Sequence, residues 1–186
     1  MSEPTIDLSE YESKFSLNNK MARAAWNLCR VVLFRPFVFN FFNPWRLFVL
    51  RLFGAKIASN AMVYASARIW APWNLTMGEH ACLGPEADCY NQGHITIGAH
   101  TTVSQKSYLC ASSHDIRDPK HRLLLKPIVI ADQAWVAADA FIGPGVSIGQ
   151  GAVVAARSAV FDNVAPWTIV RGNPAICVGR REMRAS

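Results

Sequence analysis

The second half of the chain places a β-branched residue at every sixth position between residues 130 and 160. A helix repeats every 3.6 residues and a strand alternates every two, so a period of six fits strands arranged in a longer repeat. The repeated residues are Ile130, Val136, Ile142, Ile148, Val154 and Val160. The position two before each of them is apolar or small. The pattern predicts a β-solenoid whose narrow corners are filled by the branched side chains.

The same period continues upstream, but two extra residues interrupt it near 73–74 and two more near 93–94. We call each of these interruptions a reset. The upstream members are Ile57, Val63, Ile69, Met77, Leu83, Cys89, Ile97, Val103 and Leu109. Three six-residue units make one triangular turn, so we expect about five coils between residues 57 and 165. Residues 112–127 interrupt the period, and a stacked solenoid should exclude them as a loop.

The segment before the repeat is apolar and basic. Residues 20–56 contain seven Lys and Arg and no acid, whereas residues 1–19 form a polar, acidic tail. We predict two amphipathic helices. The first covers 20–35 and ends before Pro36; the second has Asn43 as N-cap and Pro44 at its first position, and ends near Gly54. These helices either pack on the main domain or a partner subunit, or attach the protein to an anionic membrane surface.

The composition further limits the classes of protein to which the chain can belong. With 186 residues, 51% hydrophobic and 17% charged, the chain suits a single domain. Five cysteines without a CxxC pair favour a reducing compartment, and the polar first nineteen residues do not resemble a signal peptide. The longest uncharged run of the helical segment, 36–45, is too short to span a bilayer. We expect a cytoplasmic protein, and no nucleic-acid partner because the basic stretch is apolar.

The repeat and the ending "GNPA" at 172–175 resemble the hexapeptide-repeat proteins. The resemblance covers 57–178 and leaves 179–186 as a basic tail. It implies a left-handed parallel β-helix, although the general rule for parallel crossovers would favour the right hand. It also implies a homotrimer whose active sites lie between subunits and use acetyl-CoA as co-substrate.

Several blocks resemble a narrower group, the colanic acid biosynthesis acetyltransferases. These blocks are "LRLFGAKI" (50–57), "ARIWAPWNLTMG" (67–78), "DCYNQG" (88–93), "VSQKSYLCASSHDI" (103–116) and "APWTIVRGNPA" (165–175). The resemblance implies transfer of an acetyl group to a sugar hydroxyl in exopolysaccharide biosynthesis. A lipid-linked saccharide at the inner face of the bacterial inner membrane would give the basic helical segment a purpose.

By the same resemblance, His114 is the catalytic residue, at the point where the excluded loop begins. A neutral imidazole, with a pKa of about 6.5 in unperturbed form, can accept the proton that an attacking hydroxyl loses near neutral pH. The thioester is already activated, so no acyl-enzyme is required. The alternative is a solvated loop histidine.

Three further residues are candidates on the acceptor side. Asp115 could orient His114. Asn91 matches a stretch that contacts the acceptor in relatives, although an asparagine also suits the turn at the reset. Trp135 matches a tryptophan beside the acyl-transfer site; the alternative is packing against the next subunit.

The co-substrate candidates lie near the end of the repeat. Ala138 and Ala156 match positions whose backbone binds pantetheine in relatives. The CoA phosphates require basic side chains, for which Arg171, Arg180 and Arg181 are the candidates. Relatives often have a basic residue directly after "GNPA", where this chain has Ile176.

Other functions fit the repeat less well. A serine acetyltransferase should have a larger helical N-terminal domain. A nucleotide-sugar N-acyltransferase differs only in its acceptor and stays open, as does a non-enzymatic scaffold. A γ-type carbonic anhydrase needs three zinc-binding histidines, and the histidine spacings of 14, 6, 14 and 7 do not suit that set. No metal is expected.

Overall fold

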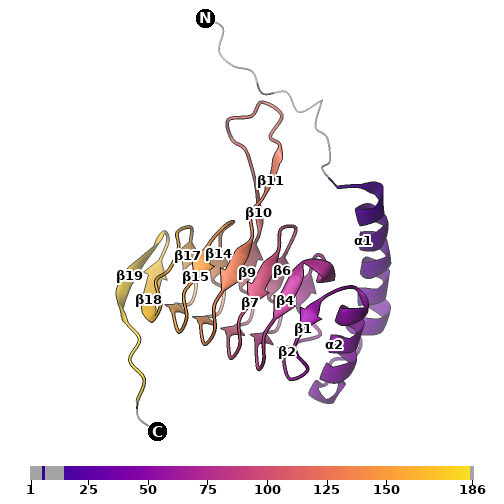
Figure 1. The fold of residues 1–186 in the computed structure, drawn as a ribbon, viewed down its shortest axis with the longest axis horizontal. Coiled ribbons are helices and arrows are strands. Elements are labelled where there is room, and N and C mark those ends of the chain that lie inside the picture. Colours follow the sequence, from indigo (N-terminus) through magenta and orange to yellow (C-terminus); the bar gives the residue numbers. More distant parts are fainter. Residues whose placement is uncertain (1–5, 7–14, 185–186) are drawn as a thin grey trace, which may run out of the picture.

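The computed structural model describes Ile6 and residues 15–184, so most of the predicted 1–19 tail lies outside the described residues. The chain forms a parallel β-helix with two helices at its N-terminal end and a hairpin that projects from one side (Figure 1). The predicted solenoid of about five coils is confirmed. Val164 pairs with Ile148 and the strand at Val170 pairs with that at Val154, so a partial sixth turn follows the fifth coil.

Each coil contributes one short strand to each of three sheets. The first sheet contains β1 (Lys56–Ile57), β4 (Leu75–Met77), β7 (Ile95–Ile97), β12 (Ile128–Ile130) and β15 (Ser147–Ile148). The second contains β2 (Met62–Val63), β5 (Cys82–Leu83), β8 (Thr102–Val103), β13 (Trp135–Val136), β16 (Val153–Val154), β18 (Thr168–Gly172) and β19 (Ala175–Arg180). The third contains β3 (Arg68–Ile69), β6 (Asp88–Tyr90), β9 (Tyr108–Cys110), β14 (Phe141–Ile142) and β17 (Ala159–Val160).

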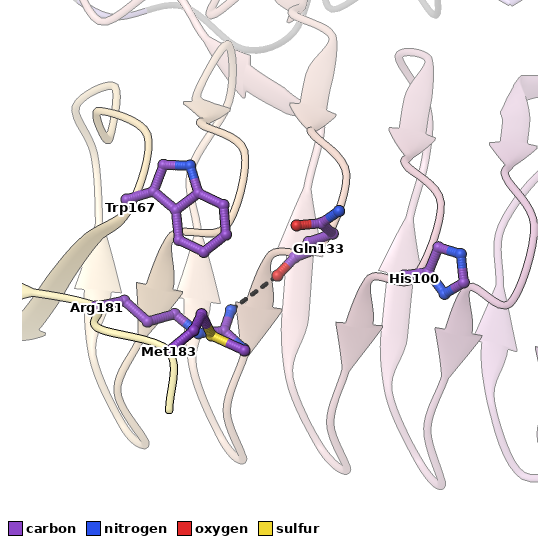
Figure 2. Close-up of a pocket in the computed structure, with 5 residues that line it drawn as sticks. All are labelled: His100, Gln133, Trp167, Arg181 and Met183. Carbon is purple, nitrogen blue, oxygen red and sulfur yellow. Dashed lines mark hydrogen bonds between the residues drawn. The ribbon is translucent and has the colours of Figure 1, made fainter. Parts of the chain in front are cut away.

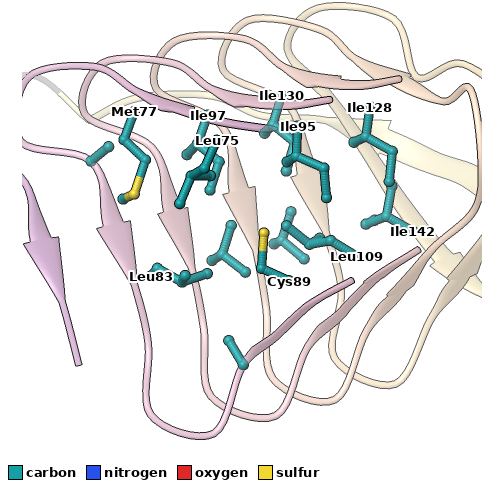
Figure 3. Close-up of a cluster of buried hydrophobic side chains, with 14 of the residues drawn as sticks. Leu75, Met77, Leu83, Cys89, Ile95, Ile97, Leu109, Ile128, Ile130 and Ile142 are labelled. Carbon is teal, nitrogen blue, oxygen red and sulfur yellow. The ribbon is translucent and has the colours of Figure 1, made fainter. Parts of the chain in front are cut away.

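The register agrees with the six-residue period. Ile57 pairs with Met77, Met77 with Ile97, Ile97 with Ile130, and Ile130 with Ile148, and all five are buried. The other two sheets stack the remaining repeated residues in the same way. The aliphatic side chains therefore form continuous columns inside the prism (Figure 3). The paired residues are 20 apart in the first two intervals, which confirms the two resets.

A turn with a left-handed residue recurs three positions after the repeated residue. His80, His100 and Gln133 have φ values of 54°, 57° and 61°, and Gly151 has 66° in the same column. Such turns suit type II geometry, which places a residue of positive φ at its third position. This recurring turn bends the chain from one sheet to the next.

The helical segment begins earlier than predicted and ends near the predicted residue. α1 (Leu17–Cys29) has Ser16 as its N-cap and continues into a π-helical turn, Arg30–Phe34. A 3₁₀ turn, Asn40–Phe42, leads into α2 (Asn43–Leu52), which ends close to Gly54 as expected.

Asn43 is not the N-cap of α2; that position belongs to Phe42. The Asn43 side chain instead donates to the Ala61 carbonyl (2.8 Å) and accepts from the Val63 N–H (3.1 Å). The exposed edge of the first coil needs partners for its backbone groups, and this requirement overrides the capping preference.

The helices close this end of the solenoid with polar side chains. Arg46, which is buried, donates to the Val63 carbonyl at 2.8 Å. Arg51 donates to the Ile57 carbonyl, and the Trp26 indole donates to the Ile69 carbonyl at 2.8 Å. The packing interpretation of the helical segment is therefore confirmed for its inner face.

The opposite end is closed by an antiparallel hairpin. β19 pairs with β18 from Thr168↔Arg180 to Gly172↔Ala175. The predicted tail from residue 179 is therefore partly wrong, because Gly179 and Arg180 belong to this strand. Backbone pairing with the last coil explains why the chain does not leave the body at "GNPA".

Gly151→Ala should destabilise the fold. A Cβ at Gly151 would lie 2.6 Å from the Trp167 ring, and its φ is +66°. We expect a loss of about 2–4 kcal/mol, from strain and overpacking together, in urea unfolding. Gly145→Ala is the control, because its φ is +81° but its nearest neighbours, 3.4 Å or more away, are atoms of the flexible Lys126 side chain. Equal losses in the two variants would remove the Trp167 contact from this explanation.

Candidate active site

His114 lies on the hairpin that leaves the third coil. β10 (Ser112–His114) pairs antiparallel with β11 (Leu123–Leu125), with His114 opposite Leu123. The excluded loop predicted for 112–127 is thus an ordered hairpin projecting from the prism (Figure 1). The hairpin therefore carries His114 away from the coils of its own chain.

The His114 ring is oriented by a backbone group. Its Nδ1 lies 2.5 Å from the His121 carbonyl oxygen. Because a carbonyl only accepts, Nδ1 carries the proton, and in the neutral ring Nε2 is the basic nitrogen. His121 itself has φ +45°, and the turn that contains it is held by Asp118.

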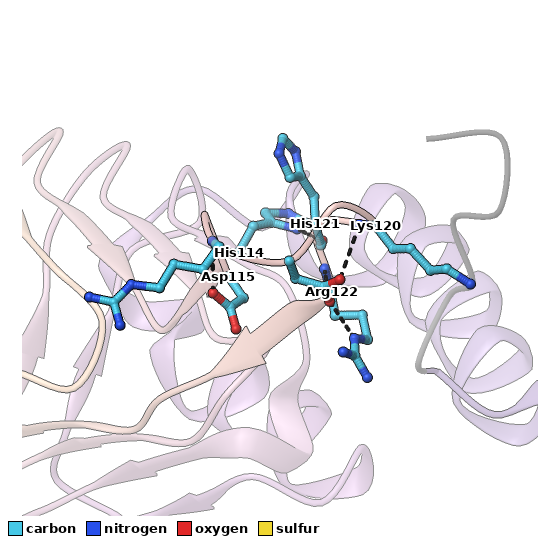
Figure 4. A network of polar contacts seen from close by, with 7 residues as sticks. His114, Asp115, Lys120, His121 and Arg122 are labelled. Carbon is cyan, nitrogen blue, oxygen red and sulfur yellow. Dashed lines mark hydrogen bonds and ion pairs between the residues drawn. The ribbon is translucent and has the colours of Figure 1, made fainter. Parts of the chain in front are cut away.

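Asp118 fixes the tip of this hairpin. Its carboxylate accepts from the Lys120 and Arg122 N–H groups and forms an ion pair with the Arg122 guanidinium. Figure 4 shows Lys120 and Arg122 of this network close to His121. The hydrogen bond from Arg122 is the main cause that lowers the pKa of Asp118 below its usual value. The ionised tip thus holds the His121 carbonyl in place.

Asp115 supports the turn that follows His114. Its Oδ1 accepts the N–H of Arg117 at 3.0 Å, so the carboxylate supports the local turn. The group that contacts the His114 ring at Nδ1 is the His121 carbonyl, and an orienting role of Asp115 stays a prediction.

Asn91 is a structural residue in this chain. It is fully buried; its Oδ1 accepts the Ala71 N–H at 3.0 Å and its Nδ2 donates to the Ala71 carbonyl at 2.6 Å. Both ends of the amide are thus occupied within the chain, and the acceptor contact stays a prediction. The cause is the reset: the extra residues leave the Ala71 backbone groups without a strand partner, and the amide satisfies both.

Trp135 lies on β13 in the second sheet, and its Nε1 donates to Ser104 Oγ at 2.9 Å. Its ring is largely on the outside of the prism. The hairpin that carries His114 leaves instead from the corner after the third sheet. Within one chain, Trp135 and His114 therefore lie on different sides of the triangular prism.

Three co-substrate candidates lie along one edge. Ala138 and Ala156 occupy equivalent turns of successive coils, where the Arg157 N–H donates to the Ala138 carbonyl at 2.9 Å. Arg171 is exposed in β18, directly after Val170, whose carbonyl accepts from the Ala155 N–H in the neighbouring coil. Along this edge, the small residues Ala138 and Ala156 are thus followed by the positively charged Arg171.

Arg180 and Arg181 lie toward the other edge of the second sheet. Arg180 pairs with Thr168, and the Arg181 guanidinium donates to the carbonyls of Gln133 (2.8 Å) and Gly151 (3.2 Å). Arg181 lines a pocket of about 390 Å³ whose other lining residues are His100, Gln133, Trp167 and Met183 (Figure 2). A single subunit therefore does not gather the three predicted arginines in one place.

A second group of basic residues was missed from the sequence. Arg23, Arg30 and Arg68 surround Asp88 in a pocket between α1 and the third sheet. Their positions in the chain have no motif spacing, and only the acid-free composition of 20–56 gave a signal. Burial of Asp88 raises its pKa, although Arg68 and Arg30 act in the opposite direction.

A metal cluster and a membrane-spanning helix are both absent from the described residues, 15–184 and Ile6. No three His, Cys, Asp or Glu side chains there lie close enough together to hold a metal ion. No helix in that range is long and apolar enough to cross a membrane.

Comparison with known proteins identifies the family. No family model matches the chain. The protein named "Putative colanic acid biosynthesis acetyltransferase WcaF" of Escherichia coli K12 is 48% identical over 137 residues, which are 74% of this chain and 75% of the relative. The chain belongs to the colanic acid biosynthesis acetyltransferases. It is thus an acetyltransferase of the hexapeptide-repeat class, as the sequence predicted.

Solved structures agree with this fold. The hexapeptide-repeat acetyltransferase VCA0836 of Vibrio cholerae superposes with a TM-score of 0.80 at 25% identity, over 90% of this chain and 95% of that chain. A galactoside acetyltransferase in complex with coenzyme A superposes with a TM-score of 0.81 at 18% identity, over 91% and 86% of the two chains. At that identity the second likeness concerns the fold alone.

Asn91→Ala should affect stability and spare acetyl-CoA binding. The substitution removes the Asn91 oxygen that accepts the buried Ala71 N–H, a loss of about 1–3 kcal/mol, whereas the Ala71 carbonyl still accepts the Asn74 N–H. We expect a lower midpoint in thermal unfolding, while the further rise caused by acetyl-CoA stays as in the wild type. Asn60→Ala, at an exposed turn of the first coil, is the control. If Asn91→Ala left the stability unchanged but abolished turnover of the acceptor, Asn91 would be assigned to the acceptor site.

Proposed function

We propose that this acetyltransferase transfers acetyl from acetyl-CoA to a saccharide hydroxyl in exopolysaccharide assembly. His114 acts as the general base: the hydroxyl oxygen attacks the thioester carbonyl, the hydroxyl proton passes to His114 Nε2, and the CoA thiolate leaves and takes up a proton. The observation that carries this proposal is the oriented His114 ring on an ordered hairpin. Backbone N–H groups stabilise the oxyanion that forms during the attack.

The proposal includes a homotrimer. His114 and Trp135 lie on different sides of one prism, so a site that contains both needs two copies of the chain. Because Ala138 and Ala156 have small side chains, the pantetheine arm would be able to approach the backbone closely at this edge. Arg171 would meet the phosphates on that edge, and the neighbouring subunit's Arg180 would supply further charge.

His114→Ala should lower turnover about 100- to 10,000-fold, the usual contribution of a general base. Acetyl-CoA binding should persist, so a ligand concentration of a hundred times the dissociation constant should still add about 2.7 kcal/mol of stability. Turnover is followed as CoA thiol release over a panel of saccharides. His121→Asn is the matched control, because its carbonyl and not its ring orients His114, and asparagine tolerates the positive φ. Near-full activity in His114→Ala would exclude it as the base.

We further propose that the outer face of the helical segment contacts an anionic membrane that carries the acceptor. The face is defined by exposed apolar residues on both helices and their connection: Leu17, Met21, Leu28, Val32, Phe39, Phe41, Phe48 and Leu52. Lys20, Arg35 and Arg51 are exposed in the same segment. No acidic residue occurs from 13 to 78, so an anionic surface would meet only positive side chains.

Phe48→Ser should weaken flotation with anionic vesicles by about ten-fold, because one buried phenyl ring contributes roughly 1.5–3 kcal/mol. Phe161→Ser is the control: the two rings are 54% and 55% exposed, and Phe161 lies on the solenoid. Vesicles of phosphatidylcholine alone should bind less of either protein than vesicles containing phosphatidylglycerol. Equal flotation of the two variants, or none for the wild type, would contradict membrane contact through this face.

A further inference from the structure

A pocket of about 180 Å³ lies where α1 crosses the third sheet, at the first two coils. Its basic lining residues are Arg23 and Arg30 from the helical segment and Arg68 from β3. Asp88 and Tyr90 of β6 complete the opposite wall. A second pocket of about 320 Å³ shares Arg23, Asn27 and Trp70 with the first, so the two form one continuous groove along α1.

The charge of this groove is not balanced by its own residues. Three guanidinium groups face one carboxylate, and the ion pair between Arg68 and Asp88 is loose at 3.9 Å. Among the described residues, Asp88 is the one acidic residue that lines the smaller pocket, and no acidic residue lines the larger one. An anion in this position would therefore enter a site with an excess of positive charge.

The groove also contains polar atoms without partners. Arg23 Nη1 and Asn19 Oδ1 are buried, and within the described part of the chain neither has a hydrogen-bond partner. Partial burial lowers the pKa of Arg23 below its usual value. Unsatisfied buried groups are costly, and a ligand that pairs with them would remove that cost.

Aromatic rings provide a flat wall beside the arginines. The Arg23 guanidinium lies 3.5 Å from the centroid of the Trp70 ring, and the rings of Trp70 and Tyr90 are 6.3 Å apart. The Tyr90 hydroxyl accepts from the Gln92 amide at 2.8 Å. Rings of this kind offer an apolar face to a pyranose, while the adjacent forked guanidinium groups bind oxygen pairs of a carboxylate or phosphate.

We propose that this groove binds the anionic group, a carboxylate or a phosphate, of the saccharide acceptor. The inference rests on the proposed function and names its substrate class. The groove is separate from the edge of Ala138, Ala156 and Arg171, because it is built from α1 and the first two coils. Arg23 and Arg30 hold the anion with Arg68, and Trp70 packs against the sugar ring.

The test measures binding of four small probes to the full-length chain in the presence of CoA, by ligand-observed NMR. Methyl glucuronide and glucose 1-phosphate carry the anion, methyl glucoside is neutral, and inorganic phosphate lacks the sugar. We expect both anionic sugars, or one of them, to bind at least ten-fold more tightly than methyl glucoside. The anionic sugar that binds more tightly shows whether the groove prefers a carboxylate or a phosphate. If inorganic phosphate binds most tightly of the four probes, the proposal that the groove recognises a saccharide is overturned.

Two substitutions test the pocket in opposite directions. Arg68→Gln should weaken the anionic probe about ten-fold, whereas Asp88→Asn should strengthen it, a gain that structural damage would not produce. Lys56→Gln, which removes one positive charge at β1 in the first sheet, is the control and should change nothing. An anionic probe that binds no better than the neutral one, or an Asp88→Asn variant that binds it more weakly, would overturn the proposal.

The test is separable from that of the acetyltransferase function. Stabilisation by acetyl-CoA reports on the co-substrate edge, and it should be unchanged in Arg68→Gln and Asp88→Asn. Loss of the acetyl-CoA effect in the wild type would count against the proposed function, whereas its persistence without any preference for anionic sugars would count against the groove alone.

Discussion

The whole structure depends on the hydrogen-bond ladder between successive coils. Each backbone group in a coil pairs with the coil before and after it, so the coils must stay in register along the prism. Extra residues are accommodated only at the corner after the third sheet. The two resets and the hairpin of His114 all lie at that corner. The candidate base is therefore placed by the same constraint that keeps the core columns aligned.

A ladder of this kind has two open ends, and their closure shapes the surface. The first coil is closed by side chains of the helical segment, including the buried Arg46 and Asn43. Because the inner faces of α1 and α2 are used for closure, their apolar outer faces remain exposed. The same placement brings Arg23 and Arg30 against the third sheet. The helices thus create both surfaces for which partners are proposed.

The candidate catalytic machinery is divided among the sides of the triangle. The edge with Ala138 and Ala156 belongs to the late coils, Trp135 faces outward from the second sheet, and the His114 hairpin extends beyond its own prism. Such a division is expected where prisms associate, because each subunit then supplies a different part of a shared site. The arginine groove of the early coils would then position the acceptor, and the late coils the co-substrate.

The sequence alone determined the solenoid, its resets and the excluded segment, because one residue in six must fill the core whatever surrounds it. It also pointed to His114 through resemblance, and that role stays a prediction, while the family itself is shown by the comparison. The roles of Asn43 and Asn91 were decided by tertiary structure, since both amides satisfy backbone groups of residues 18 to 20 positions away. The convergence of Arg23 and Arg30 with Arg68 was likewise invisible, because contacts across about 40 residues leave no local pattern.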